Sequence, residues 1–368
     1  MERKRIFTTA TFVVAAAGYG FCLLPKNAIG QEASADSALY SMFEKTLDNS
    51  HRERFREAIS IAMKIRGKYP EEPAGAFGLL ATYQTISRNY RVKLYESQID
   101  SLLDLSIELA EEAVKRDKKN GIGYFYLGSA YGMRCIHNAS QRDWFAALRD
   151  GSNVSESFER AIRYNPKFYD SYYGLGLYKY WLGAKSKILR ILPFSKDKRH
   201  EGIKHIKLAI EKGRFLNVDA MYGLSAAYFN EGEYEQALEI TDRLYEEYPY
   251  NPTLLYRRGR IFQALERWQS AKVSFEKLYD ILKNAEFQSV SYQVDCLYQI
   301  AKCDFNLGNY LQAQQCCEEA ISMEEHCDFS KEREGPLEEF SEIKDGLHEL
   351  NKNAEAQMLT EAKTSPGE

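Results

Sequence analysis

The chain has 368 residues, of which 44% are hydrophobic and 28% are charged, and its formal net charge is −4. This composition can form a sizeable core or an elongated stack of elements, and it excludes a disordered polar chain. A slightly acidic molecule has no general attraction for nucleic acid, so we expect no nucleic-acid partner.

The first thirty residues are typical of a bacterial export signal. A basic start with Arg3, Lys4 and Arg5 precedes the apolar stretch TFVVAAAGYGFCLL at residues 11–24, and small residues suited to cleavage follow it. The apolar stretch is shorter than the ~18 residues that a membrane-spanning helix usually needs. We therefore predict a signal peptide at residues 1–30 and a periplasmic or secreted protein. An uncleaved N-terminal helix that anchors the chain is the alternative.

Residues 31–72 are expected to contain N-terminal helices and the first unit of a helical repeat. Ala58, Ala62 and Ile65 are spaced for one face of a helix, and Pro70 ends that helix. One such unit cannot bury its apolar face alone, so further copies must stack on it.

Three longer units of the same kind occupy residues 73–217. In each unit, the two positions at which its helices are expected to cross lie 26 residues apart: Leu80 and Ser106, Gly128 and Val154, and Gly176 and Gly202. Small residues at such a crossing allow two helices to approach to ~8–10 Å.

Three shorter units occupy residues 218–327, and in these the same two positions lie twelve residues apart. The clearest copy, Val218–Asn251, has a glycine that ends its first helix, a proline that stops its second, and small or apolar residues at the packed positions: Leu224, Ser225, Tyr228, Gly232, Tyr234, Ala237, Leu244 and Pro249. This segment closely resembles the tetratricopeptide repeat (TPR), and residues 252–285 and 294–327 resemble it as well.

The resemblance implies an all-α fold, a right-handed superhelical solenoid of about seven TPR helical hairpins. The fourteen extra residues in each long unit correspond to about two turns per helix. We therefore predict three elongated hairpins whose tips project from one edge of the solenoid. A short extra helix in each connection is the alternative. Residues 328–368 are expected to form a capping helix and a disordered tail.

The sequence carries no recognisable catalytic or cofactor motif. It contains no HExxH, GxSxG or P-loop, no CxxCH for haem and no CxxC pair for zinc. Five cysteines nevertheless lie within 32 residues: Cys296, Cys303, Cys316, Cys317 and Cys327. We favour buried thiols or a disulfide over a metal site, and the sequence assigns no pairing. We therefore expect a protein that is not an enzyme and that needs neither cofactor nor metal.

An aromatic residue recurs at the fifth position of the first helix, which in a TPR faces the concave groove. It is present in six successive copies, as Phe77, Phe125, Tyr173, Tyr222, Tyr256 and Tyr298. Other residues predicted to line this groove are Tyr180, Trp181, Phe229, Arg260, Gln263 and Lys302. Either these side chains bind a protein or peptide partner through rigid aromatic area, or they pack between neighbouring hairpins. On the first interpretation the protein is a scaffold or adaptor of the cell envelope.

A basic segment lies at the tip of the third long hairpin. Its candidate residues for an anionic surface are Lys185, Lys187, Arg190, Lys196, Lys198 and Arg199. With the apolar residues between them, they could touch an anionic membrane. Solvated bases over apolar residues that seal the tips are the other interpretation. A membrane- or lipid-associated adaptor is therefore the alternative function.

Overall fold

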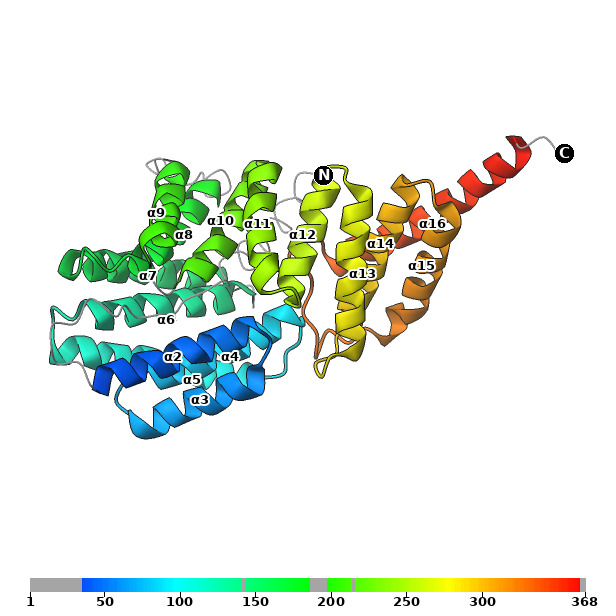
Figure 1. The fold of residues 1–368 in the computed structure, drawn as a ribbon. Coiled ribbons are helices and arrows are strands. Elements are labelled where there is room, and N and C mark those ends of the chain that lie inside the picture. The colour runs from blue at the N-terminus through cyan, green and yellow to red at the C-terminus, as the bar shows by residue number, and fades with distance from the viewer. Residues whose placement is uncertain (1–34, 141–142, 186–196, 214–215, 365–368) are drawn as a thin grey trace. The chain divides into compact units, whose positions relative to one another are not determined.

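A computed structural model describes residues 35–140, 143–185, 197–213 and 216–364. Across these residues the chain forms fifteen α-helices and one short 3-10 helix, with no strand (Figure 1). The prediction of an all-α fold is confirmed. None of the described helices is both long and apolar enough to cross a membrane. The predicted signal peptide lies outside the described residues.

The chain divides into two compact units. Unit 1 contains residues up to Thr85 together with Tyr95–Gly232, and unit 2 contains Ile86–Leu94 together with Glu233–Glu368. The helices of unit 1 are α2 (Ala35–His51), α3 (Phe55–Lys68), α4 (Pro73–Asn89), α5 (Glu96–Arg116), α6 (Gly121–Ser140), α7 (Trp144–Tyr164), α8 (Asp170–Lys185), α9 (Arg199–Lys212) and α10 (Asn217–Glu231). The last turn of α4 belongs to unit 2.

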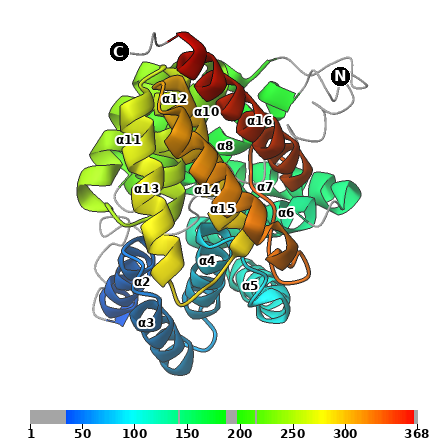
Figure 2. The same cartoon turned by 90° about the vertical axis from the view of Figure 1, so that its right-hand side faces the viewer.

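Unit 2 is a stack of shorter helices closed by a long one. Its helices are α11 (Tyr234–Glu247), α12 (Pro252–Ala264), α13 (Trp268–Asn284), α14 (Val290–Asn306), α15 (Tyr310–Met323), the 3-10 helix η1 (Glu324–His326) and α16 (Phe340–Thr364). Helices α13, α14 and α15 pack in sequence order, and α16 follows against α15 (Figure 2). Phe340, Ile343 and Leu347 of α16 are buried against α14 and α15, so the first half of this helix covers the end of the stack.

Helix α16 is longer than expected. It continues to Thr364, through residues that were expected to be disordered. The stretch beyond Ala354 is rich in alanine, glutamate, glutamine, methionine and leucine, which favour helix even without tertiary contacts.

The first two long units differ from the short ones in the length of their helices. Helices α4 to α7 have 17, 21, 20 and 21 residues, whereas α11 to α15 have between 13 and 17. The additional residues therefore extend both helices of the second hairpin, whereas in the first they lie in α5 and in the connection 90–95, because α4 is no longer than α13 or α14. In the third hairpin α8 and α9 have 16 and 14 residues, and residues 186–196 between them lie outside the described part.

Glycines allow the helices of the third hairpin to touch. A Cβ atom on Gly176 would lie 2.8 Å from the carbonyl oxygen of Gly202, and a Cβ on Gly202 would lie 2.6 Å from that of Gly176. Because real Cβ atoms do not approach a backbone so closely, only glycine fits at both positions. This crossing places the C-terminal half of α8 against its neighbours.

Candidate functional site

The aromatic residues at the fifth repeat position in unit 1 are core residues. Phe77, Phe125 and Tyr173 are fully buried, and Tyr222 is 1% exposed. Phe77 lies 6.4 Å, centroid to centroid, from Phe43 of α2. Such buried side chains present no surface to a partner, so they fit the interpretation in which this position packs between hairpins.

Three further predicted groove residues of unit 1 also pack within the unit. The Tyr180 hydroxyl lies 2.9 Å from the carbonyl oxygen of Ala227 and accepts a hydrogen bond from Asn230 at 2.8 Å. Trp181 is 5% exposed and packs edge to face against Tyr180. Phe229 is half-buried. The pair Tyr180 and Trp181 therefore joins α8 to α10 and does not line an open groove.

Most of the basic tip lies outside the described residues. This applies to Lys187, Arg190 and Lys196 entirely and to the side chain of Lys185. Lys198 is exposed, and Arg199 forms ion pairs with Asp197 at 2.7 Å and with Glu231 at 3.0 Å. Arg199 is thus already held by two carboxylates.

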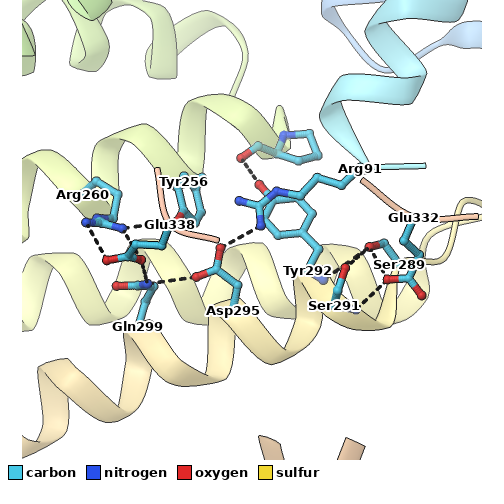
Figure 3. Close-up of polar contacts among 11 residues, drawn as sticks. Arg91, Tyr256, Arg260, Ser289, Ser291, Tyr292, Asp295, Gln299, Glu332 and Glu338 are labelled. Carbon is cyan, nitrogen blue, oxygen red and sulfur yellow. Dashed lines mark hydrogen bonds and ion pairs between the residues drawn. The ribbon is translucent and has the colours of Figure 1, made fainter. Parts of the chain in front are cut away.

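Unit 2 presents a different inner face, formed by α12 and α14. The predicted residues Tyr256, Arg260 and Gln263 lie on α12, and Tyr298 and Lys302 lie on α14. Two non-helical segments contact this face, as Figure 3 shows for several of their side chains. We name them the bend, residues 90–94 after α4, and the strap, residues 328–339 before α16.

The bend and the strap pair with each other. The backbone N–H of Lys93 donates to the carbonyl of Lys331 at 2.7 Å, and that of Arg333 donates to Arg91 at 2.8 Å. An isolated antiparallel bridge joins Val92 and Glu332. The two segments thus form one short ladder that satisfies their backbone groups where they are buried.

Arg91 of the bend occupies an aromatic and acidic subsite. Its guanidinium lies 3.6 Å from the ring centroid of Tyr292 and 4.7 Å from that of Tyr256, and its Nη1 donates to Asp295 at 2.7 Å (Figure 3). The side chains of Arg91 and Asp295 are 6% and 1% exposed. Burial opposes the charge on Arg91, but Asp295 and the two rings raise its pKa above the ordinary value. Removing one partner of such a buried pair costs about 3–5 kcal/mol.

Glu332 fixes the strap at the N-terminus of α14. Its carboxylate accepts hydrogen bonds from the backbone N–H of Ser291 at 2.7 Å and from the hydroxyl of Ser289 at 3.0 Å. Helix N-termini favour anions because their first N–H groups are unpaired and the helix dipole is positive there. Glu332 is 5% exposed, so this anchor is buried.

Glu338 occupies a cationic subsite further along the same face. Its carboxylate accepts from Arg260 Nη1 at 2.9 Å and from Gln299 Nε2 at 3.0 Å, and Lys302 Nζ lies 3.9 Å away. The side chains of Glu338, Arg260 and Lys302 are 24%, 17% and 29% exposed. An ion pair with this access to water contributes about 1 kcal/mol or less. This subsite is therefore held much less firmly than that of Arg91.

Gln299 connects the two subsites. Its Nε2 also donates to Asp295 at 2.9 Å, whereas its buried Oε1 accepts no hydrogen bond from the described residues. Gln263 donates to the backbone carbonyl of Gln299 at 3.4 Å. The residues predicted on α12 and α14 thus lie around one polar network.

Tyr298 and Lys302 lie beside this network on α14, and the Tyr298 hydroxyl lies against Gly346 of α16. Lys302 Nζ lies 5.0 Å from the centroid of the half-buried Tyr298 ring. Burial raises the pKa of the Tyr298 hydroxyl to about 12 and lowers the pKa of the Lys302 amine. A partly desolvated ammonium is suited to hold a carboxylate.

The prediction omitted five residues of this network: Arg91, Asp295, Gln299, Glu332 and Glu338. The sequence does indicate that Asp295, Gln299 and Lys302 share one helix face, because they follow one another at intervals of four and three residues. Arg91, Glu332 and Glu338 stand in segments without any period. Only the tertiary structure brings them to α12 and α14.

The cysteines form neither a disulfide nor a metal centre in the described part of the chain. All six described cysteines, including Cys303 and Cys317, are free. Burial raises the pKa of the Cys303 thiol to about 11 and that of Cys317 to about 12. No three His, Cys, Asp or Glu side chains in the described ranges are grouped to hold a metal ion.

Comparisons with known proteins agree with this architecture. Family models described as tetratricopeptide repeat match residues 219–249 and residues 294–327, the second being the copy predicted from the sequence. The fold is therefore that of a helical-repeat protein, a class that forms scaffolds for protein–protein interaction. These two segments of the chain are tetratricopeptide repeats.

Solved structures of low sequence identity are similar to this chain. The Cut9–Hcn1 hetero-tetramer of the APC/C is 16% identical, with 92% of this chain and 54% of that chain covered and a TM-score of 0.52. PilW, a type IV pilus biogenesis factor, is 17% identical, with 62% and 88% covered and a TM-score of 0.43. A thermophilic TPR protein of Thermus thermophilus is 17% identical, with 62% and 99% covered and a TM-score of 0.41. No curated protein sequence matches the chain.

Proposed function

We propose that the protein is a non-catalytic scaffold of the bacterial cell envelope that holds an extended segment of a protein partner on the inner face of unit 2. The observation that supports this most is the convergence of Arg260, Gln299 and Lys302 on one carboxylate of the strap. A surface that already holds an extended stretch of its own chain has the spacing and the donors needed to hold one from another protein.

The chemistry of this face favours recognition over reaction. Arg260 and Lys302 are cations, and Gln299 offers both a donor and an acceptor at a fixed position. The half-buried Tyr298 adds rigid aromatic area, which contributes strongly to protein interfaces. The envelope location rests on the export signal predicted at residues 1–30.

The test is capture of a partner from an envelope extract with the full chain as bait. Arg260→Ala with Lys302→Ala removes both cations of the subsite, so we expect the captured protein to be lost. Arg267→Ala with Lys283→Ala removes the same charge from side chains that lie elsewhere on unit 2, on α13 and just before it, and should leave capture unchanged. Equal capture by both variants would show that the partner binds another surface.

A further inference from the structure

The two ends of the strap are held unequally. The backbone of the strap pairs with the bend at Arg333. Gly335 lies directly against the buried guanidinium of Arg91, because a Cβ atom on this glycine would lie 2.9 Å from Nη1 of Arg91. Glu332 is buried at the N-terminus of α14. These contacts fix the first half of the strap on unit 2.

Between the Arg91 pairing and the buried Phe340 at the start of α16, the second half of the strap makes a more accessible contact. Glu338 contacts Arg260, Gln299 and Lys302; its own side chain is 24% exposed and those of Arg260 and Lys302 are 17% and 29% exposed, whereas Gln299 is buried. Pro336 has no N–H with which to join a backbone ladder. The chain can therefore give up the Glu338 contact while Glu332 and the Arg91 pairing keep the strap attached.

Two polar groups of the subsite, on Gln299 and Lys302, can form hydrogen bonds that Glu338 does not provide. The buried Oε1 of Gln299 accepts no hydrogen bond within the described ranges, although a backbone N–H of an entering segment could donate to it. Lys302 Nζ lies 3.9 Å from Glu338, further than a hydrogen bond requires. A ligand with a differently placed carboxylate and a nearby N–H can satisfy both groups.

From these observations we propose that Glu338 is an intramolecular competitor, which occupies the subsite of Arg260, Gln299 and Lys302 until an acidic side chain of an extended partner segment replaces it. This rests on the proposed function and adds the partner's chemistry and a form of regulation to it. A tethered ligand acts at an effective concentration of about millimolar. Because a partner binds only the fraction of molecules in which the subsite is open, its apparent affinity falls by that fraction.

The test uses a fluorescent peptide with the sequence of residues 334–341, EGPLEEFS, added to the full-length protein and followed by anisotropy. Glu338→Gln in the protein removes the competing charge, so we expect the peptide to bind about five- to tenfold more tightly than to the wild type. Glu339→Gln is the matched control and should bind like the wild type, because the neighbouring carboxylate is not among the contacts of the subsite. Adding Arg260→Ala and Lys302→Ala to Glu338→Gln should abolish binding.

A peptide with glutamine at the position of Glu338 should bind to none of these proteins. Thermal unfolding of Glu338→Gln should stay close to that of the wild type, because the lost contact is partly solvated. Competition is excluded if Glu338→Gln and the wild type bind the peptide equally, or if neither binds it. In that case the scaffold proposal would still be tested by partner capture, which compares the wild type with the variant that combines Arg260→Ala and Lys302→Ala.

Discussion

The inner faces of the two units surround the same repeat position with different neighbours. In unit 1 the aromatic residue at this position is sealed into the core, as with Tyr173. In unit 2 Tyr256 packs beneath the guanidinium of Arg91, and Tyr298 lies half-buried beside Lys302. A position that looks uniform in the sequence is therefore covered by other side chains of the repeat in unit 1, whereas in unit 2 polar groups of the bend and of α14 lie against it.

The difference follows from the neighbours of the aromatic side chain. In unit 1 a Cβ on Gly223 would lie 2.9 Å from the Tyr173 ring, so the glycine lets α10 close directly over that ring. On α12 and α14 the neighbours are long and polar, such as Arg260 and Gln299. Buried polar groups must be hydrogen-bonded, and the bend and the strap provide the partners.

Among the substitutions that test this comparison, Tyr173→Ala is expected to cause the largest loss of stability. We expect Tyr173→Ala to lower the free energy of unfolding by about 3–5 kcal/mol, because it leaves a cavity in the core of unit 1. Phe145→Ala is the control, since Phe145 is 89% exposed and its loss should change stability by no more than about 0.5 kcal/mol. Denaturant unfolding measures both. A stable Tyr173→Ala protein that fails to capture its partner would mean that unit 1 also has an open groove.

A similar loss is expected at Arg91, for an electrostatic reason. Arg91→Ala leaves Asp295 buried without its cation and should cost about 3–5 kcal/mol. Arg91→Met combined with Asp295→Asn removes both charges and should recover at least half of that loss. Arg267→Ala breaks an exposed pair with Glu235 and should cost about 1 kcal/mol or less. If Arg91→Ala lowers the free energy of unfolding by no more than Arg267→Ala does, the ion pair of Arg91 and Asp295 does not hold the bend in place.

A smaller loss of stability is expected at alkaline pH, and we expect it to arise in unit 2. The pKa of Cys317 is raised to about 12 by burial, so the folded protein keeps this thiol protonated at pH values where the unfolded chain ionises it. The stabilisation is complete below the unfolded pKa of about 8.5 and is lost as the pH rises toward 12. We expect the free energy of unfolding to fall between pH 8 and pH 10.5, with Cys317 contributing up to about 2 kcal/mol. Cys317→Ala should make the fall less steep, whereas an unchanged slope would place the titration elsewhere.

The repeat could be predicted well because it depends on local spacing. Ala237, a packed residue of the clearest predicted copy, is fully buried, as are Ala271 and Ala301 in the other two short units. The second long unit has its additional residues within both helices, as the interval of 26 residues indicated. Helix pairing needs only small residues at the crossing and apolar residues at helical intervals, and both can be read along the chain.

The candidate site could be predicted only in part. Tyr256, Arg260, Gln263, Tyr298 and Lys302 lie on α12 and α14 around one polar network, although Tyr256 and Gln263 are buried there, as Tyr173, Tyr180 and Trp181 are in unit 1. Whether an aromatic side chain is covered depends on what lies opposite it. That information is not contained in its own repeat.

The sequence by itself therefore determined the helical repeat, the crossing glycines and the composition of the inner faces. Only the tertiary structure decided that Arg91 and Glu338 fill the inner face of unit 2. Asp295 and Arg91 are separated by 204 residues, and Glu338 is 78 residues from Arg260. Contacts over such distances arise from the closure of long loops and leave no periodic signal in the chain.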